Sequence, residues 1–183
     1  MTLHPRSARQ MYTGEADHSL TAQLVSRVDV PVIASGDVTS RARAQAILAT
    51  TGAAAVMVGR AAQGNPWALR EMIEGDAEAP TREEVVAELI LFMRATVREL
   101  GEKRASGFLK KFYGWYLGQL GAPRITKPFK QELVQLESLD EVETRLLAAA
   151  PGAAEVLEAL QTEAPDGEDD VVLDLPISIY GGG

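Results

Sequence analysis

The sequence contains no cysteine and only two histidines among its 183 residues. It therefore offers no disulfide bond, no thiolate ligand and no cysteine nucleophile, and we expect no metal site. It also lacks an apolar run long enough to span a membrane, and no signal peptide precedes the first predicted strand. Together these absences predict a cytoplasmic protein without membrane contacts. The remaining composition, with 46% hydrophobic and 24% charged residues, is ordinary for a globular protein.

Charge is unevenly distributed along the chain. The net charge is −8, yet residues 103–130 include seven basic residues and no acidic one, and 13 of the 26 acidic residues follow position 130. Such asymmetry predicts separate acidic and basic surfaces. The basic segment also holds six of the ten aromatic residues, and its cations suit the phosphates of RNA, although a merely solvated helix face is the alternative. The candidate RNA-contacting residues are Lys103, Arg104, Lys110, Lys111 and Lys127.

The N-terminal third alternates short apolar runs with helical patterns. The runs at residues 1–3, 30–34 and 53–58 predict strands, and the last two are typical of parallel strands buried on both faces. Three parallel strands alone leave two open edges. We therefore predict that residues 1–78 are the last three βα units of a (β/α)8 TIM barrel, an α/β fold that continues into an all-α part.

A linker at residues 75–80 separates this part from a helical one. The spacing of apolar residues predicts helices over about 81–100, 106–120, 128–136, 138–149 and 153–160, which form a small helical bundle domain at 80–162. Phe108, Phe112 and Trp115 are predicted to face the bundle core. Residues 163–183 are acidic and rich in chain-breaking residues, so they are predicted to form a disordered tail.

Two loops of the N-terminal part are candidates for binding phosphate. Each follows a predicted strand and contains a glycine that permits a close backbone approach: Ser35-Gly36-Asp37 in one loop and Gly59-Arg60 in the next. Arg60 adds a planar set of donors suited to phosphate. In TIM barrels, the loops after the last two strands frequently form a phosphate site. The alternative is that both glycines only permit tight turns.

His4 and Arg6 lie just after the first predicted strand, at the end where barrel enzymes bind their ligands. The histidine can donate a hydrogen bond to a carbonyl or phosphate group, and the arginine can hold an anion or the edge of a base. Judged from spacing alone, both residues are equally compatible with a solvated loop.

A set of short segments carries a resemblance to a known family. The segments are the pattern His-x-Arg at 4–6, the pattern Tyr-x-Gly-x-Ala-Asp at 12–17, and the runs 30–37, 51–53 and 56–67, with a thinner match at Lys111 and 115–117. The run from Gly59 to Trp67 is highly specific. On these residues the chain resembles the flavin-dependent tRNA-dihydrouridine synthases, in particular the bacterial B-type branch, over about residues 2–147.

The resemblance implies an enzyme that reduces uridine in tRNA to 5,6-dihydrouridine, with FMN as the hydride carrier and NAD(P)H, usually NADPH, as the reductant. It makes tRNA the partner of the basic helical segment and assigns Arg6 to the uridine or the flavin. Ser35 stands where the family more often has asparagine, and Phe112 where the branch usually has histidine. The residues assigned to FMN are His4, Ser35, Gly36, Asp37, Gly59 and Arg60.

The family's general-acid cysteine and its other flavin contacts belong to the first half of the barrel, which the resemblance does not include. We therefore expect a C-terminal portion that is inactive alone, and that pairs with the missing half-barrel or self-associates through open strand edges. Two other interpretations stay open: a non-catalytic remnant that only binds RNA, and a different FMN- or phosphate-binding barrel oxidoreductase. The Gly59–Trp67 run disfavours the second of these.

Overall fold

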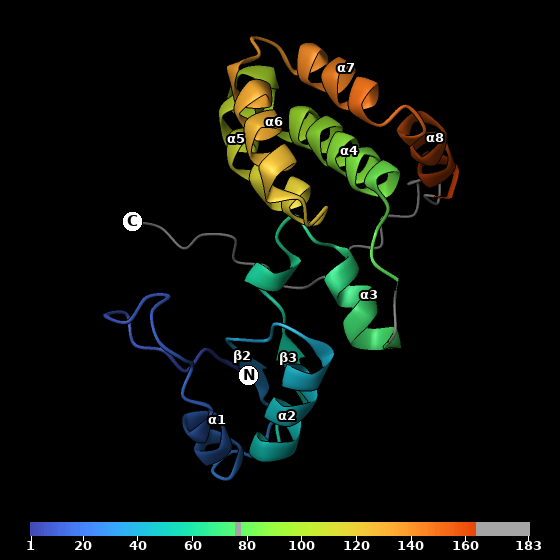
Figure 1. Ribbon diagram of the computed structural model, residues 1–183. Helices are drawn as coiled ribbons and strands as arrows, with labels where there is room; N and C mark the ends of the chain where they lie inside the picture. The colour runs from blue at the N-terminus through green and yellow to red at the C-terminus, as the bar shows by residue number, and fades with distance from the viewer. Residues whose placement is uncertain (76–77, 164–183) are drawn as a thin grey trace.

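The structure is a computed structural model that describes residues 1–75 and 78–163 (Figure 1). Its first part alternates strands and helices, and its second part is helical. The first part contains β1 (Thr2–Leu3), α1 (His18–Val25), β2 (Ile33–Ser35), α2 (Arg41–Thr51), β3 (Ala55–Met57), the 3-10 turn η1 (Arg60–Ala62) and α3 (Trp67–Glu74). The second part contains α4 (Arg82–Leu100), α5 (Glu102–Gly118), α6 (Pro123–Gln135), α7 (Leu139–Ala149) and α8 (Ala153–Glu163).

The three strands form one parallel sheet in the order β1-β2-β3, with a helix in each connection. Thr2 lies opposite Ile33, and Ser35 lies opposite Met57. The predicted combination of a parallel α/β part with a helical part is therefore confirmed, although the strands are shorter than expected. Because three strands do not close a barrel, membership of a TIM barrel stays a prediction.

Local sequence signals explain where the first two helices begin and end. The Asp17 side chain accepts a hydrogen bond from the backbone N–H of Ser19 at the start of α1, and Ser40 accepts one from Arg43 at the start of α2. Helix α2 ends at Gly52, whose φ of 71° lies in the left-handed region that glycine enters without strain. These caps fix the direction in which each loop leaves its helix.

The prediction that the last two strands are buried on both faces is wrong for β3. One face packs against α2 through a buried cluster that consists of Ala34, Val38, Ala44, Ile47 and Ala53. Val56 packs against this cluster, but its neighbours Ala55 and Met57 are exposed. Successive strand residues point to opposite faces, and in the described part of the chain the face with Ala55 and Met57 is exposed at β3 and half-buried at β2.

Helices α4 to α8 pack around one apolar core, which confirms the predicted helical bundle (Figure 1). Capping boxes begin two of these helices, with Thr81 and Glu84 at α4 and Ser138 and Glu141 at α7. In each box the two residues accept hydrogen bonds from each other's backbone N–H, so neither helix start leaves those donors unpaired. The largest fully buried side chains of the bundle are Val85, Leu89, Ile90, Leu109, Tyr113, Leu117, Leu133 and Leu146.

Two details of the predicted bundle are wrong. The third helix was predicted to start at 128, but α6 starts at Pro123 and contains Pro128 in its interior. Pro123 is tolerated because a proline at the first helical position lacks only an N–H that the helix does not use. On α5, the residues that face the core are Leu109, Tyr113 and others on the same stripe, whereas Phe108 and Trp115 are 37% and 38% exposed. Phe112 does pack against the core, with its ring centroid 4.8 Å from that of Phe92 on α4, so the prediction is wrong only for Phe108 and Trp115.

The first and second parts touch where Gly64 meets α5. A Cβ atom on Gly64 would lie 2.6 Å from the Cβ of Trp115 and 2.8 Å from the backbone nitrogen of Tyr116, so no side chain fits there. Trp67, just after this loop, packs against the core of the bundle. The predicted domain boundaries stay predictions, and residues 164–183, which make up nearly all of the predicted tail, lie outside the described residues.

Candidate functional site

The carboxyl ends of the three strands surround a cavity of about 550 Å³. The loop after each strand contributes to its lining, as expected where parallel strands end side by side. All seven residues predicted to contact FMN or the uridine line this cavity: His4, Arg6, Ser35, Gly36, Asp37, Gly59 and Arg60. The structure thus brings them together, while their individual roles stay predictions.

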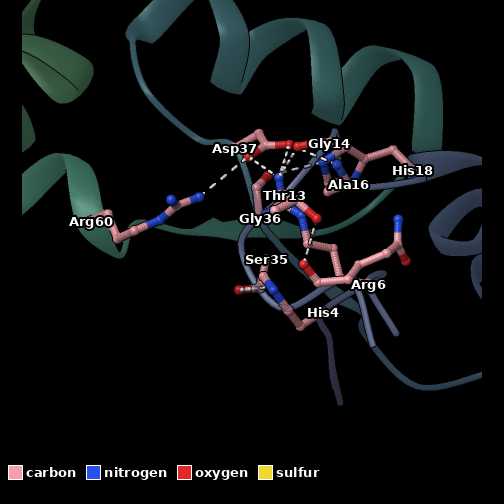
Figure 2. A network of polar contacts seen from close by, with 11 residues as sticks. His4, Arg6, Thr13, Gly14, Ala16, His18, Ser35, Gly36, Asp37 and Arg60 are labelled. Atoms are coloured by element: carbon pink, nitrogen blue, oxygen red, sulfur yellow. Dashed lines mark hydrogen bonds and ion pairs between the residues drawn. The ribbon is translucent and has the colours of Figure 1, made fainter. Parts of the chain in front are cut away.

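The Asp37 carboxylate joins three segments of the site (Figure 2). Arg6 Nη2 donates to both of its oxygens, at 2.7 and 2.8 Å, and the Ala16 N–H donates to Oδ2 at 2.7 Å. Arg60 Nη2 lies 3.7 Å from Oδ1. The hydrogen bond from Ala16 is the main reason why the pKa of Asp37 lies below its ordinary value; burial opposes this shift, and Arg6 and Arg60 add to it. Asp37 is therefore an anion at neutral pH.

The backbone at Gly36 and Asp37 explains how this carboxylate reaches the first loop. Gly36 has a φ of 108° and Asp37 a φ of 55°, and aspartate is among the few non-glycine residues that tolerate the left-handed region. A Cβ atom on Gly36 would lie 2.9 Å from the Cβ of Ala16 and 3.2 Å from Cε1 of His4. Glycine is therefore required for the two loops to approach as closely as they do.

Arg6 has hydrogen-bonding capacity that the protein does not use. Its side chain is 3% exposed, and Nη2 also donates to the carbonyl oxygen of Gly14 at 2.8 Å. Nε and Nη1 are buried and have no hydrogen-bond partner among the described residues. Burying a charged donor without a hydrogen-bond partner costs free energy, so a ligand whose oxygens accept from Nε and Nη1 would be bound favourably.

The other polar side chains at the cavity are less buried than Arg6. His4 Nδ1 lies 3.2 Å from Ser35 Oγ. The Arg60 side chain is 54% exposed, and its guanidinium carbon lies 4.9 Å from the centroid of the Tyr12 ring, a cation–π contact. Arg60 is therefore held near the cavity by Tyr12 and Asp37 while much of its surface stays accessible.

Sequence reasoning missed Tyr12 and His18 as parts of this site. His18 Nε2 lies 3.0 Å from the carbonyl oxygen of Gly36, and because a carbonyl oxygen only accepts, Nε2 is the donor. Thr21 Oγ1 lies 3.4 Å from the other ring nitrogen. Tyr12 stands in the segment that carries the resemblance, which was an available signal. His18 is brought to Gly36 only by the folding of α1 beneath the loop, and no spacing in the sequence shows this contact.

A second cavity, of about 660 Å³, lies between α5 and α6. Its cationic lining consists of Lys110, Lys111, Lys127 and Lys130, and we call it the lysine groove. The first three lysines were predicted to contact RNA, and the structure adds Lys130. Lys103 and Arg104 are exposed near the start of α5 and do not line the groove. The ion pairs found among the described residues involve none of the four groove lysines.

The described residues offer neither a membrane span nor a metal site. No helix in this part of the chain is both long and apolar enough to cross a membrane. Within the same residues, no group of three or more histidine, cysteine, aspartate or glutamate side chains is placed to hold a metal ion. A larger groove of about 990 Å³ beside α6 contains no residue predicted for the site.

These features define a parallel α/β unit with an arginine-containing site at the carboxyl ends of its strands, joined to a helical bundle with a lysine-lined groove. Comparison with known protein families adds the family. The profile described as dihydrouridine synthase (Dus) matches residues 1–155, and the chain belongs to this family.

Similar proteins include several bacterial proteins named tRNA-dihydrouridine synthase B. The chain is 31% identical over 173 residues to tRNA-dihydrouridine synthase B of Pseudomonas putida, which covers 91% of this chain and 49% of the relative. It is 36% identical over 125 residues to the protein of the same name from Proteus vulgaris, covering 64% of this chain and 38% of the relative. It is 35% identical over 153 residues to tRNA-dihydrouridine synthase B of Escherichia coli K12, and the match covers 76% of this chain and 46% of the relative. The predicted resemblance is confirmed, and the chain spans less than half of each of these relatives.

Proposed function

We propose that this chain forms the FMN-phosphate-binding and tRNA-binding portion of a cytoplasmic tRNA-dihydrouridine synthase. Such an enzyme reduces uridine in tRNA to 5,6-dihydrouridine with FMN and NADPH. The names of the relatives support the activity, and the family match supports its extension to this chain. In this proposal, residues 1–78 belong to a TIM barrel, and the exposed sheet face at Met57 is the one that lines the barrel interior.

The residues at the strand ends fit the phosphate and ribityl part of FMN. The observation that carries this proposal is the buried Arg6 side chain, whose Nε and Nη1 have no partner in the described protein. The half-exposed Arg60 supplies a second cation at the same cavity. A Cβ atom on Gly59 would meet nothing within 4 Å, so the backbone of that loop is open to a ligand.

Each residue has a distinct task in this arrangement. Arg6 and Arg60 hold the phosphate, since a guanidinium donates to its oxygens in a planar fork. The Asp37 carboxylate repels a phosphate, so we assign it to positioning Arg6 and Arg60. His4 and Ser35, which contact each other, are placed to hydrogen-bond the ribityl hydroxyls or the flavin ring.

The flavin, when bound, supplies the hydride, and this portion of the enzyme orients it. The chain has no cysteine and so does not itself supply the general-acid cysteine that the resemblance implies. We therefore expect weak FMN binding and no reduction of uridine by this chain alone. The lysine groove and the nearby Lys103 and Arg104 supply the affinity for tRNA phosphates.

A binding titration with FMN and with inorganic phosphate, followed by calorimetry, tests the site. Arg60→Ala should weaken both ligands by roughly tenfold, because a charge-assisted hydrogen bond at a half-exposed side chain is lost. Arg27→Ala is the matched control, since Arg27 is exposed and does not line the cavity. Equal affinities of the wild type and Arg60→Ala would contradict the assignment.

A second candidate function is RNA binding without a flavin, and the lysine groove favours it because the groove does not depend on the strand-end site. The two candidates differ in one measurement. A chain that binds tRNA but neither FMN nor phosphate at any accessible concentration is the RNA-binding remnant. A chain in which both ligand classes bind, with Arg60→Ala affecting only FMN and phosphate, is the synthase portion.

A further inference from the structure

Three aromatic side chains form a row along α5. Phe108, Phe112 and Trp115 follow one another at helical spacing, with ring centroids 4.9 Å apart in each neighbouring pair. Phe108 and Trp115 are both more than one-third exposed. Phe112 is half-buried and packs against the bundle core, whereas Phe108 and Trp115 lie outside that core, so core packing does not account for these two exposed rings.

Lys111 connects this aromatic row to the lysine groove. Its Nζ lies 4.3 Å from the ring centroid of Phe108 and 5.1 Å from that of Phe112, and the same residue lines the groove. The side chain is thus held against the rings with its charge at the boundary between the two features. Because residues 103–130 contain no acidic side chain, this surface attracts anions and repels a second copy of itself.

The aromatic row also has a defined position relative to the strand-end site. Its last member, Trp115, lies directly beside Gly64, in the loop that follows Arg60. Helices α5 and α6, which form the lysine groove, lie side by side in the bundle (Figure 1). The row therefore extends from the groove to the junction between the bundle and the first part of the chain.

A cationic groove beside exposed aromatic rings suits one kind of nucleic acid. In an RNA duplex the bases are stacked inside, and only phosphates and sugars reach a protein surface of this kind. In an unpaired strand the bases can stack on aromatic side chains while the backbone follows the positive charge. A groove alone would bind either form, whereas a row of exposed rings adds affinity only for unpaired bases.

We propose that α5 binds an unpaired segment of RNA, with its phosphates in the lysine groove and its bases against Phe108 and Trp115. This inference rests on the proposed function, in which the bundle binds tRNA. It adds that the bundle contacts a loop or single strand of the RNA, and it names the residues that distinguish such a segment from a stem.

Fluorescence anisotropy with the full chain and two labelled probes tests the inference. One probe is a short single-stranded RNA and the other is a duplex of the same length. The double variant Phe108→Ala/Trp115→Ala should bind the single strand roughly tenfold or more weakly and the duplex as the wild type does, because stacking contributes only to the former. Lys110→Glu/Lys127→Glu should weaken both probes. Ile125→Ala, which also trims an exposed apolar side chain of the bundle, is the control and should change neither.

A second measurement does not depend on the alanine variants folding. The chain has two tryptophans, so Trp67→Phe leaves Trp115 as the only one. The single-stranded probe should quench Trp115 fluorescence through stacking, and the duplex at equal occupancy should not. Equal quenching by both probes, or no loss of single-strand affinity in the double variant, overturns the inference and leaves the tRNA role intact. A wild type that binds neither probe nor tRNA overturns both.

Discussion

Replacing Gly64 with alanine is expected to destabilise the protein by about 2–5 kcal/mol, from two additive causes. Gly64 has a φ of 63°, and a residue with a Cβ atom in the left-handed region costs about 1–2 kcal/mol. The new methyl group would also lie 2.6 Å from Trp115 Cβ and 2.8 Å from two backbone atoms of α5. Overpacking of this kind costs about 1–3 kcal/mol, because backbone atoms cannot move aside as a flexible side chain can.

The chain provides a control that separates the two causes. Gly121 has nearly the same φ, 62°, but a Cβ atom there would meet nothing within 4 Å. Gly121→Ala should therefore show only the conformational cost of about 1–2 kcal/mol. The difference between the two variants measures the contact between the loop and α5.

Equilibrium unfolding in urea, monitored by circular dichroism, gives both free energies of unfolding. The denaturant midpoint should fall further for Gly64→Ala than for Gly121→Ala, with similar m-values if the folded states are equally compact. Equal midpoints for the two variants would refute the reasoning, because they would mean that α5 does not lie against residue 64 in solution.

Three further predictions concern single residues. Asp37→Asn removes the charge from the hydrogen bonds that Arg6 donates and should lower the free energy of unfolding at neutral pH by about 2 kcal/mol. Folding lowers the pKa of Asp37 from its ordinary 3.8, so the wild type should be more stable than the variant above pH 3.8 and lose this difference as the pH falls through the lowered pKa. A difference in free energy of unfolding that stays constant down to acidic pH would contradict this. Thr81→Ala removes a capping box and should cost about 1 kcal/mol in urea unfolding, whereas the exposed Thr144→Ala should cost little. Leu146→Ala empties a fully buried position and should lower the free energy of unfolding by about 2–5 kcal/mol; a loss as small as that of the half-exposed Leu69→Ala would refute its place in the core.

The elements of the fold were largely predictable because their signals are local. The capping box at Thr81 and Glu84 lies within one turn of the helix that it begins, and the strand after Pro31 ends in a glycine loop. The predictions that failed concern which side chains are buried, and burial depends on packing partners that are distant in the sequence. The packing of the neighbouring helices left Phe108 and Trp115 outside the core while it buried Leu109. The exposure of Met57 reflects the absence of a covering layer in the described residues.

The candidate site was predictable in its members but not in its internal contacts. Glycine loops at the ends of parallel strands converge by topology, so the sequence was enough to place Gly36, Arg60 and Arg6 near one another. The pairing of Arg6 with Asp37 required the left-handed backbone at Asp37, which no residue pattern specifies. The contribution of His18 required the packing of α1 against the loop.

The register of the sheet has a consequence for the order in which the chain acquires its structure. Pairing Thr2 with Ile33 requires the closure of a long loop before any strand contact is gained, whereas the bundle helices start from signals within a single turn. Local helical contacts form fast and distant parallel pairing forms slowly. Within this chain the strand segments precede the bundle, so slow pairing leaves them open after the local helical contacts have formed. During that interval their apolar edges are open to other chains, and the yield of folded protein depends on how quickly β1 finds β2.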